Sequence, residues 1–248
     1  MQLSEIDKGD WRLQTTAHLS EEWVSPWTGM TSPKGTRITV VSIIQLTKKK
    51  LLTIPIPNAT ASMLNASANA YEKARKLRTD SGIDKSLKND VSFNSEQDAL
   101  DYIERMIEAI VLAFSATEAF ANESIPNDFV FARHKRSEVI LEAANKQTIE
   151  RKLSTDEKLT SVLPEVFNCQ SPKGSHCWQG YKQLKSVRDR IIHMKTEDRK
   201  SSGPDLDTVW KAIVLSPAPH LAAKAIIDHF FKSMPSKPKW HERFPNES

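Results

Sequence analysis

The chain has 248 residues, of which 39% are hydrophobic and 27% charged, and its formal net charge is +4 at pH 7. Two cysteines cannot supply a disulfide scaffold, and seven scattered glycines form neither a dinucleotide-binding motif nor a P-loop. No apolar run is long enough to cross a bilayer, and the N-terminus lacks the apolar segment of a secretion signal. We therefore expect a cytoplasmic protein that does not interact with a membrane.

Residues 1–57 carry the only strong strand signals of the chain. Residues 1–36 place three tryptophans among prolines and glycines, which indicates an irregular layer pinned by aromatic side chains. Two runs of β-branched residues, at 37–46 and 51–57, are separated by three lysines and predict a β-hairpin. Its second strand should lie at a sheet edge, because Pro55 has no N–H to donate to a ladder.

From residue 58 onward the apolar residues recur with the period of a helix, which predicts a helical bundle over residues 58–234. The most apolar predicted helix covers residues 96–121, and Ser95 is placed to cap it. Its apolar arc is so wide that we expect it at the centre of the bundle. The other predicted helices cover residues 58–78, 137–152, 155–167, 175–195, 205–215 and 220–233.

The remaining residues, 235–248, contain three prolines and predict an extended tail docked through Trp240. The predicted fold class is therefore mainly α, a helical bundle with an N-terminal β-hairpin appendage and a C-terminal tail.

One segment, residues 181–195, breaks the helical pattern by placing a charge among apolar residues. At about 100° per residue, Arg188 falls inside the apolar sector that contains Leu184, Val187 and Ile191. A buried guanidinium needs a carboxylate partner, because an unpaired buried charge is too costly. Such an arginine either marks a functional site or extends to the edge of the apolar sector and holds a structural carboxylate.

His193 follows Asp189 by four residues, so their side chains can meet on one face of a helix. A carboxylate in that position can fix the tautomer of an imidazole and make it a better general base. A cationic histidine near a helix C-terminus is also favourable by about 0.3–1 kcal/mol without any catalytic role. Taken alone, this capping interpretation is the simpler one.

The spacing Arg188-Asp189-x-x-x-His193 resembles the R-x(4–6)-H motif of the HEPN superfamily, in which a small polar residue commonly follows the arginine. A second stretch, residues 113–123, is similar to the helix that precedes this motif in many prokaryotic HEPN proteins. Together the two stretches extend the resemblance over residues 95–200. It implies an all-α bundle with the motif at the end of a late helix.

The resemblance implies a metal-independent RNA endonuclease that needs no cofactor and acts as a homodimer, used as a toxin or in defence against phage. In this interpretation His193 is the general base or acid, Arg188 holds the phosphate and Asp189 orients His193. Other residues are expected to support the arginine or to contact RNA: Glu118, Asn122 and Glu123 in the first role, and Lys185, Arg190 and Lys195 in the second. The expected partners are RNA and a cognate antitoxin or regulatory protein.

Other constellations carry less weight. Cys169, His176 and Cys177 lack the number and spacing of zinc ligands, so no metal site is expected. The basic cluster at residues 133–136 is most simply a solvated helix start. The alternative to a nuclease is a non-catalytic HEPN-like helical module that binds a protein or a nucleotide, with Arg188 and His193 in structural roles.

Overall fold

The computed structural model describes residues 9–14, 16–135, 141–234 and 237–244. The chain divides into two compact units, and each is described by itself below. The first unit contains residues 1–62 together with residues 237–248, and the second contains residues 63–236.

Short antiparallel strand pairs make up most of the first unit. Its strands are β1 (Thr16–His18), β2 (Trp23–Val24), β3 (Thr31–Ser32), β4 (Arg37–Thr39), β5 (Val41–Thr47) and β6 (Lys50–Pro55). β1 pairs with β4, β2 with β3 and β5 with β6. The β5–β6 pair is the hairpin that the two β-branched runs predict, with an irregular register between Gln45 and Thr47. β1, β2 and β3 lie where an irregular layer was expected, and each has only two or three residues.

The C-terminal residues of the first unit are not wholly extended, because they contain the helix α9 (Lys239–Arg243). Trp240 is buried, as the sequence indicates, and Phe244 packs edge-on against Trp11 with 5.9 Å between the ring centres. Burial of these aromatic rings therefore holds residues from the two ends of the chain together.

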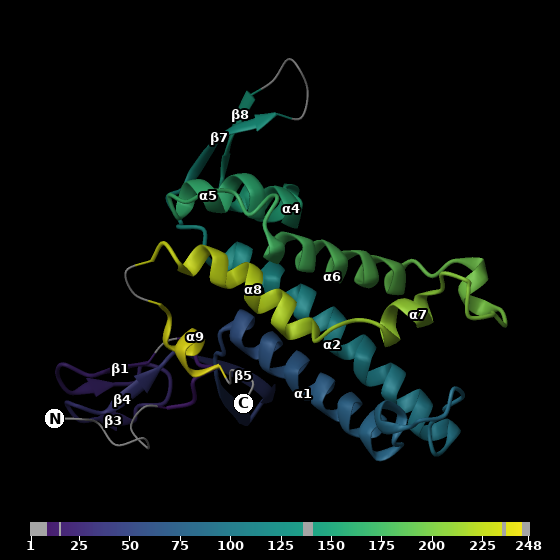
Figure 1. The fold of residues 1–248 in the computed structure, drawn as a ribbon. Helices are drawn as coiled ribbons and strands as arrows, with labels where there is room; N and C mark the ends of the chain where they lie inside the picture. Colours follow the sequence, from purple (N-terminus) through teal and green to yellow (C-terminus); the bar gives the residue numbers. More distant parts are fainter. Residues whose placement is uncertain (1–8, 15, 136–140, 235–236, 245–248) are drawn as a thin grey trace. The chain divides into compact units, whose positions relative to one another are not determined.

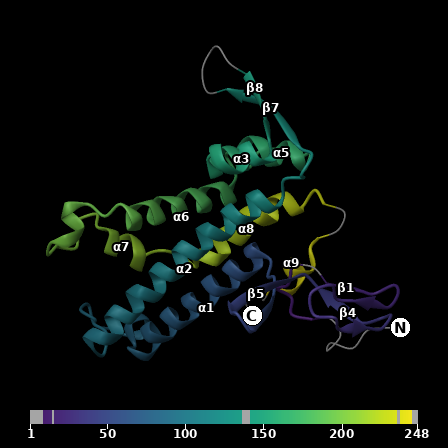
Figure 2. The same cartoon turned by 180° about the vertical axis from the view of Figure 1, so that it is seen from behind.

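Five helices of the second unit, four of them long, form a bundle around α2 (Figures 1 and 2). These helices are α1 (Ala59–Asp80), α2 (Glu96–Glu123), α6 (His176–Ile192), α7 (Val209–Val214) and α8 (Pro219–Phe231). α2 contacts α6, α7 and α8, and α6 also contacts α7 and α8. Ser95 caps α2 by accepting a hydrogen bond from the Asp98 N–H, which confirms the predicted helix start.

A second hairpin corrects the prediction of a helix over residues 137–152. β7 (Val130–Lys135) pairs with β8 (Leu141–Asn145), and only α3 (Lys146–Lys152) is helical. Asn145 accepts a hydrogen bond from the Thr148 N–H and so starts the helix at Lys146, nine residues later than expected. Residues 137–140 of the predicted helix lie outside the described part of the chain.

Between α3 and α6 the chain makes a short, irregular helical segment. It consists of α4 (Thr155–Glu157), a π-helical turn (Lys158–Val162) and α5 (Leu163–Val166), close to the single helix predicted over residues 155–167. Ser154 and Glu157 form a capping box at its start. Two 3₁₀ turns, Ile83–Lys85 and Thr196–Arg199, complete the helical elements described.

The fold is mainly α, as predicted, with small two-stranded sheets added to it. Of the helices in the described residues, none combines the length and the apolar composition that crossing a bilayer requires.

Candidate functional site

Helix α6 carries the Arg-x₄-His motif and has one buried face. Ser175 accepts a hydrogen bond from the Trp178 N–H and caps the helix at the predicted start. Tyr181, Leu184 and Val187 recur at three-residue steps and are buried. This face packs against α2 and α8, so the motif lies on a late helix of the bundle.

Arg188 lies at the margin of that buried face and stacks on an aromatic ring. Its guanidinium carbon is 3.6 Å from the centre of the Phe114 ring of α2. Its Nη1 atom is 2.8 Å from Oδ1 of Asp189, and 26% of the side chain remains exposed. Its Nε atom is buried and has no hydrogen-bond partner among the described residues. The guanidinium is thus stacked on Phe114, while about a quarter of the Arg188 side chain is exposed to solvent.

The carboxylate that pairs with Arg188 is therefore its neighbour Asp189, which we expected to orient His193. The structure links Asp189 to His193 through the backbone, because the His193 N–H donates to the Asp189 carbonyl at 2.9 Å. α6 ends at Ile192, three residues before the predicted end, and His193 follows as its C-cap with an exposed side chain. The motif is accordingly open to solvent at the C-terminal end of α6.

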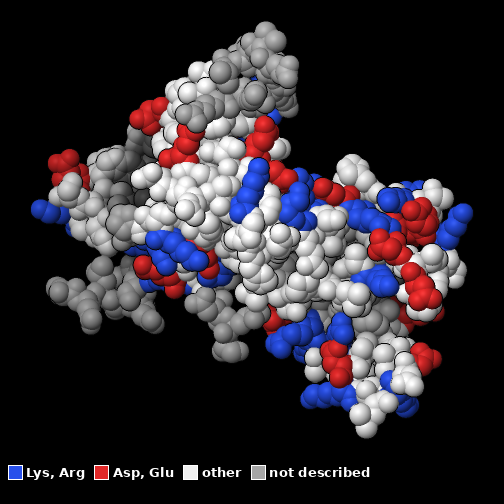
Figure 3. All heavy atoms as spheres, turned by 45° about the horizontal axis from the view of Figure 1, so that its top comes forward, with Lys and Arg blue, Asp and Glu red and all other residues white. Residues whose placement is uncertain are grey.

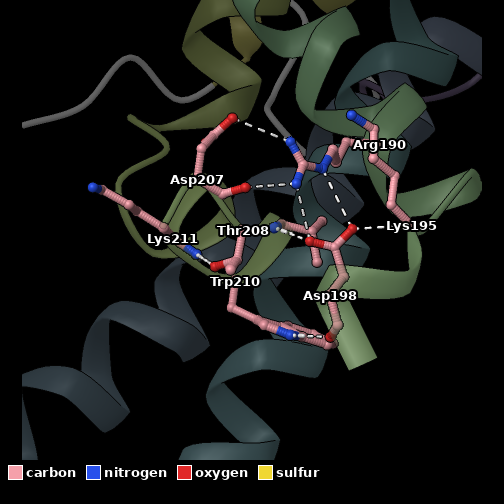
Figure 4. Close-up of polar contacts among 8 residues, drawn as sticks. Arg190, Lys195, Asp198, Asp207, Thr208, Trp210 and Lys211 are labelled. Carbon is pink, nitrogen blue, oxygen red and sulfur yellow. Dashed lines mark hydrogen bonds and ion pairs between the residues drawn. The ribbon is translucent and has the colours of Figure 1, made fainter. Parts of the chain in front are cut away.

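Arg190, predicted to contact RNA, belongs to a hydrogen-bonded network at that end of α6 (Figure 4). Its Nη2 atom is 3.0 Å from Oδ1 of Asp198, and its Nη1 atom is 3.2 Å from Oδ2 of Asp207. The Asp198 side chain has no exposed surface and also accepts the N–H groups of Lys195 and Val209, at 2.9 and 2.8 Å.

The hydrogen bond from Arg190, followed by those from the backbone, lowers the pKa of Asp198 to about 2. Arg190 and Lys195 lie on either side of His193 in the sequence, and Asp198 binds the side chain of the first and the backbone of the second. The network therefore fixes the chain on both sides of the imidazole. The Lys195 side chain is exposed.

Lys185, the third predicted RNA contact, shares the carboxylate of Asp156 with two other donors. Its Nζ atom is 3.0 Å from Oδ1, the Lys182 Nζ atom is 3.2 Å from Oδ2, and the Tyr181 hydroxyl donates to Oδ1 at 2.6 Å. Burial raises the pKa of Asp156, but the hydrogen bonds from Tyr181, Lys185 and Lys182 outweigh it and leave that pKa below its usual value. Burial and the bond to Asp156 together raise the pKa of Tyr181.

Two of the predicted supporting residues, Glu118 and Asn122, lie near a buried lysine that the sequence reasoning missed. Lys158 is 1% exposed, and its Nζ donates to Oδ1 of Asn122 at 2.8 Å and to the Glu150 carbonyl at 3.0 Å. Burial lowers the pKa of Lys158, while the charges of Glu118 and Glu150 oppose that shift. The overlooked signal was its spacing, since Lys158 stands four residues before the buried Val162.

Glu118 therefore acts on Lys158, while the ion pair found for Arg188 is the one with Asp189. Glu123 is exposed at the end of α2. The geometry thus separates two groups: an open motif at the end of α6, and a buried cluster where α2 meets the π-helical turn.

Within the described ranges, no three His, Cys, Asp or Glu side chains gather in a way that would hold a metal ion. Cys169 and Cys177 are free thiols. No protein-family model matches the chain, and comparison with curated proteins and with solved structures gives no match.

Proposed function

We propose that this chain is a metal-independent RNA endonuclease of the HEPN type that acts through Arg188 and His193. The observation that carries the proposal is an arginine stacked on Phe114, with its guanidinium partly open, and an exposed histidine at the end of the same helix. The mainly α fold, with the motif late in the chain and packed on a central apolar helix, supports it.

The proposed reaction is internal attack by a ribose 2′-hydroxyl on the adjacent phosphorus. His193 takes the 2′-hydroxyl proton as the new O–P bond forms, the bond to the 5′-oxygen breaks, and the departing 5′-oxygen takes a proton from water, which leaves a 2′,3′-cyclic phosphate and a 5′-hydroxyl end. Arg188 donates hydrogen bonds to the phosphate and stabilises the charge that develops there. Phe114 and Asp189 hold the guanidinium before substrate arrives, so little reordering is needed when the RNA binds.

The proposal includes a homodimer in which two such motifs face a shared cleft, and a cytoplasmic role as a toxin or phage-defence effector. A cognate antitoxin or regulatory protein would then hold the activity in check.

A second candidate function is a non-catalytic HEPN-like module that binds a protein or a nucleotide. The favouring observation is that Arg188 already has an ion-pair partner in Asp189 and a ring beneath it, as a structural arginine would. In that case replacement of Arg188 lowers stability and has no effect on RNA.

The experiment compares cleavage of end-labelled RNA by the wild type, His193→Ala and His176→Ala in the presence of EDTA. His176 is an exposed histidine at the other end of α6 and serves as the matched control. We expect cleavage by the wild type and the control, and its loss in His193→Ala with an unchanged melting temperature. Intact RNA with the wild type, or equal cleavage by all three proteins, contradicts the proposal.

A further inference from the structure

One face of α6 continues from the motif towards the start of the helix. At about 100° per residue, five side chains fall within an arc of about 80°, which borders the buried arc about 40° from Tyr181. This α6 face consists of Trp178, Lys182, Lys185, Asp189 and His193. With about 1.5 Å of rise per residue it is about 22 Å long, which is enough for several nucleotides.

Basic and acidic side chains alternate along the surface at α6, as Figure 3 shows for the region where Figure 1 places that helix. Lys182 and Lys185 provide two positive charges on this face; Asp156 of α4 offsets one of them, and the negative charge of Asp189 is paired with Arg188. An ammonium group has three N–H donors. Because one donor on each lysine suffices for the contact with Asp156, the others remain for phosphate oxygens.

The aromatic member of the face is Trp178, which is partly exposed. Its ring lies 5.1 Å from that of Tyr181, and the Lys182 Nζ atom lies 5.9 Å from its centre. Tyr181 is buried, and its hydroxyl is bound to Asp156, so the indole is supported from below by a fixed ring. A supported, partly exposed indole next to cations is the combination on which unpaired bases stack.

We propose that the α6 face binds single-stranded RNA, with phosphates on Lys182 and Lys185 and a base stacked on Trp178. The strand then runs along the helix to Arg188 and His193. This inference rests on the proposed function for its choice of RNA, and it adds Trp178 and Lys182 as binding residues. Single-stranded RNA is the favoured ligand because a base paired within a duplex does not present its face to an indole.

The test measures binding without cleavage. The probe is a fluorescent 2′-O-methyl oligouridine, which lacks the 2′-hydroxyl that internal attack requires, and its binding is followed by fluorescence anisotropy at several salt concentrations. Variants of the full chain are Lys182→Ala, Trp178→Leu and Trp178→Phe. Lys76→Ala removes an exposed lysine from α1 and is the matched charge control.

We expect Trp178→Leu to weaken binding about tenfold and Trp178→Phe to restore most of it, because a phenyl ring still stacks. Lys182→Ala should lower the slope of log affinity against log salt by about 0.7, as loss of one phosphate contact does for a single strand. Lys76→Ala should bind like the wild type, and a duplex of the same length should respond little to Trp178→Leu. Melting temperatures identify a variant that fails to fold.

Two results overturn the inference: no binding of the probe by the wild type, or equal binding by the wild type, Lys182→Ala and Trp178→Leu. The proposed function fails separately. Binding of the probe without cleavage of natural RNA keeps the α6 face and removes the nuclease. If Lys182→Ala and Trp178→Leu cleave natural RNA with an unchanged KM, the nuclease is supported and RNA binding by the α6 face is ruled out.

Discussion

Two aspartates bind α6 to neighbouring segments, and their surroundings differ. Asp198 has a fully buried carboxylate that accepts two backbone N–H groups as well as Arg190. The carboxylate of Asp156 is 27% exposed and accepts only side-chain donors, from Tyr181, Lys182 and Lys185.

This difference means that Asp198 holds the structure in place, whereas the contacts of Asp156 can rearrange when a ligand binds. Backbone N–H groups cannot turn away from Asp198 without unfolding the loop, so this carboxylate holds the end of α6 in one shape. Lysine side chains are flexible and strongly hydrated, so Lys182 and Lys185 can exchange part of their contact with Asp156 for a phosphate. The same type of ion pair therefore positions His193 at one place and offers a binding surface at another.

The largest expected effect follows from removal of the buried carboxylate. Asp198→Ala leaves two backbone N–H groups and a guanidinium without their acceptor, so the melting temperature should fall by about 5 °C or more. Asp156→Ala should lower it by less, because Lys182 and Lys185 reach water and the buried Tyr181 hydroxyl alone is left without its acceptor. Thermal unfolding followed by circular dichroism measures both melting temperatures. An equal decrease in Asp198→Ala and Asp156→Ala would contradict the proposed difference between the two carboxylates.

Acid should act on the same carboxylate. The folded-state pKa of Asp198 is about 2, below the value of 3.8 usual for the free side chain, so its contribution to stability is complete above about pH 4. That contribution is lost as the pH falls from about 4 to about 2. Urea unfolding of Asp198→Asn over this range should therefore depend less on pH than that of the wild type. Asp207→Asn, altered at an exposed carboxylate, should retain the wild-type dependence.

A moderate gain in RNA binding, rather than a loss of stability, is expected when the partly exposed carboxylate of Asp156 is removed. Asp156→Asn removes a negative charge beside Lys182 and Lys185, so the 2′-O-methyl oligouridine should bind about threefold more tightly. The asparagine oxygen can still accept the Tyr181 hydroxyl. Anisotropy measured at low and high salt tests this, and weaker binding would show that the lysines need Asp156 to hold them in place.

The smallest effect should come from removal of the ion pair between Arg190 and Asp207. Asp207 is 85% exposed, and exposed ion pairs add little to stability. Asp207→Asn should shift the melting temperature by no more than about 2 °C and leave RNA cleavage unchanged. A loss as large as that of Asp198→Ala would mean that both carboxylates support the end of α6.

The sequence predicted elements whose signals are local. Ser95 and Ser175 mark helix starts because each side-chain oxygen accepts a backbone N–H three residues away. The β5–β6 hairpin was equally predictable, since β-branched runs joined by a short polar connector lie next to each other in the chain.

The β7–β8 hairpin was missed for the opposite reason. Apolar residues in 137–152 recur at helical spacing, but Ala144 pairs across the hairpin with Phe131, and both are buried. Pairing with a partner thirteen residues away competes with helix formation, and the spacing of apolar residues within one segment does not report that partner.

The candidate site divides in the same way. From the sequence alone, helical periodicity placed Arg188 and His193 on one helix and put the arginine inside the apolar sector, whereas the structure has it at the margin of the buried face with 26% of its side chain exposed. Only the tertiary structure decided which groups they meet: Phe114 beneath Arg188, and Asp198 holding the chain around His193. The physical reason is that the spacing of apolar residues reports only on side chains within one or two turns of the same helix. The partners of a charged side chain are set by which segments the packed core brings within about 3 Å of it.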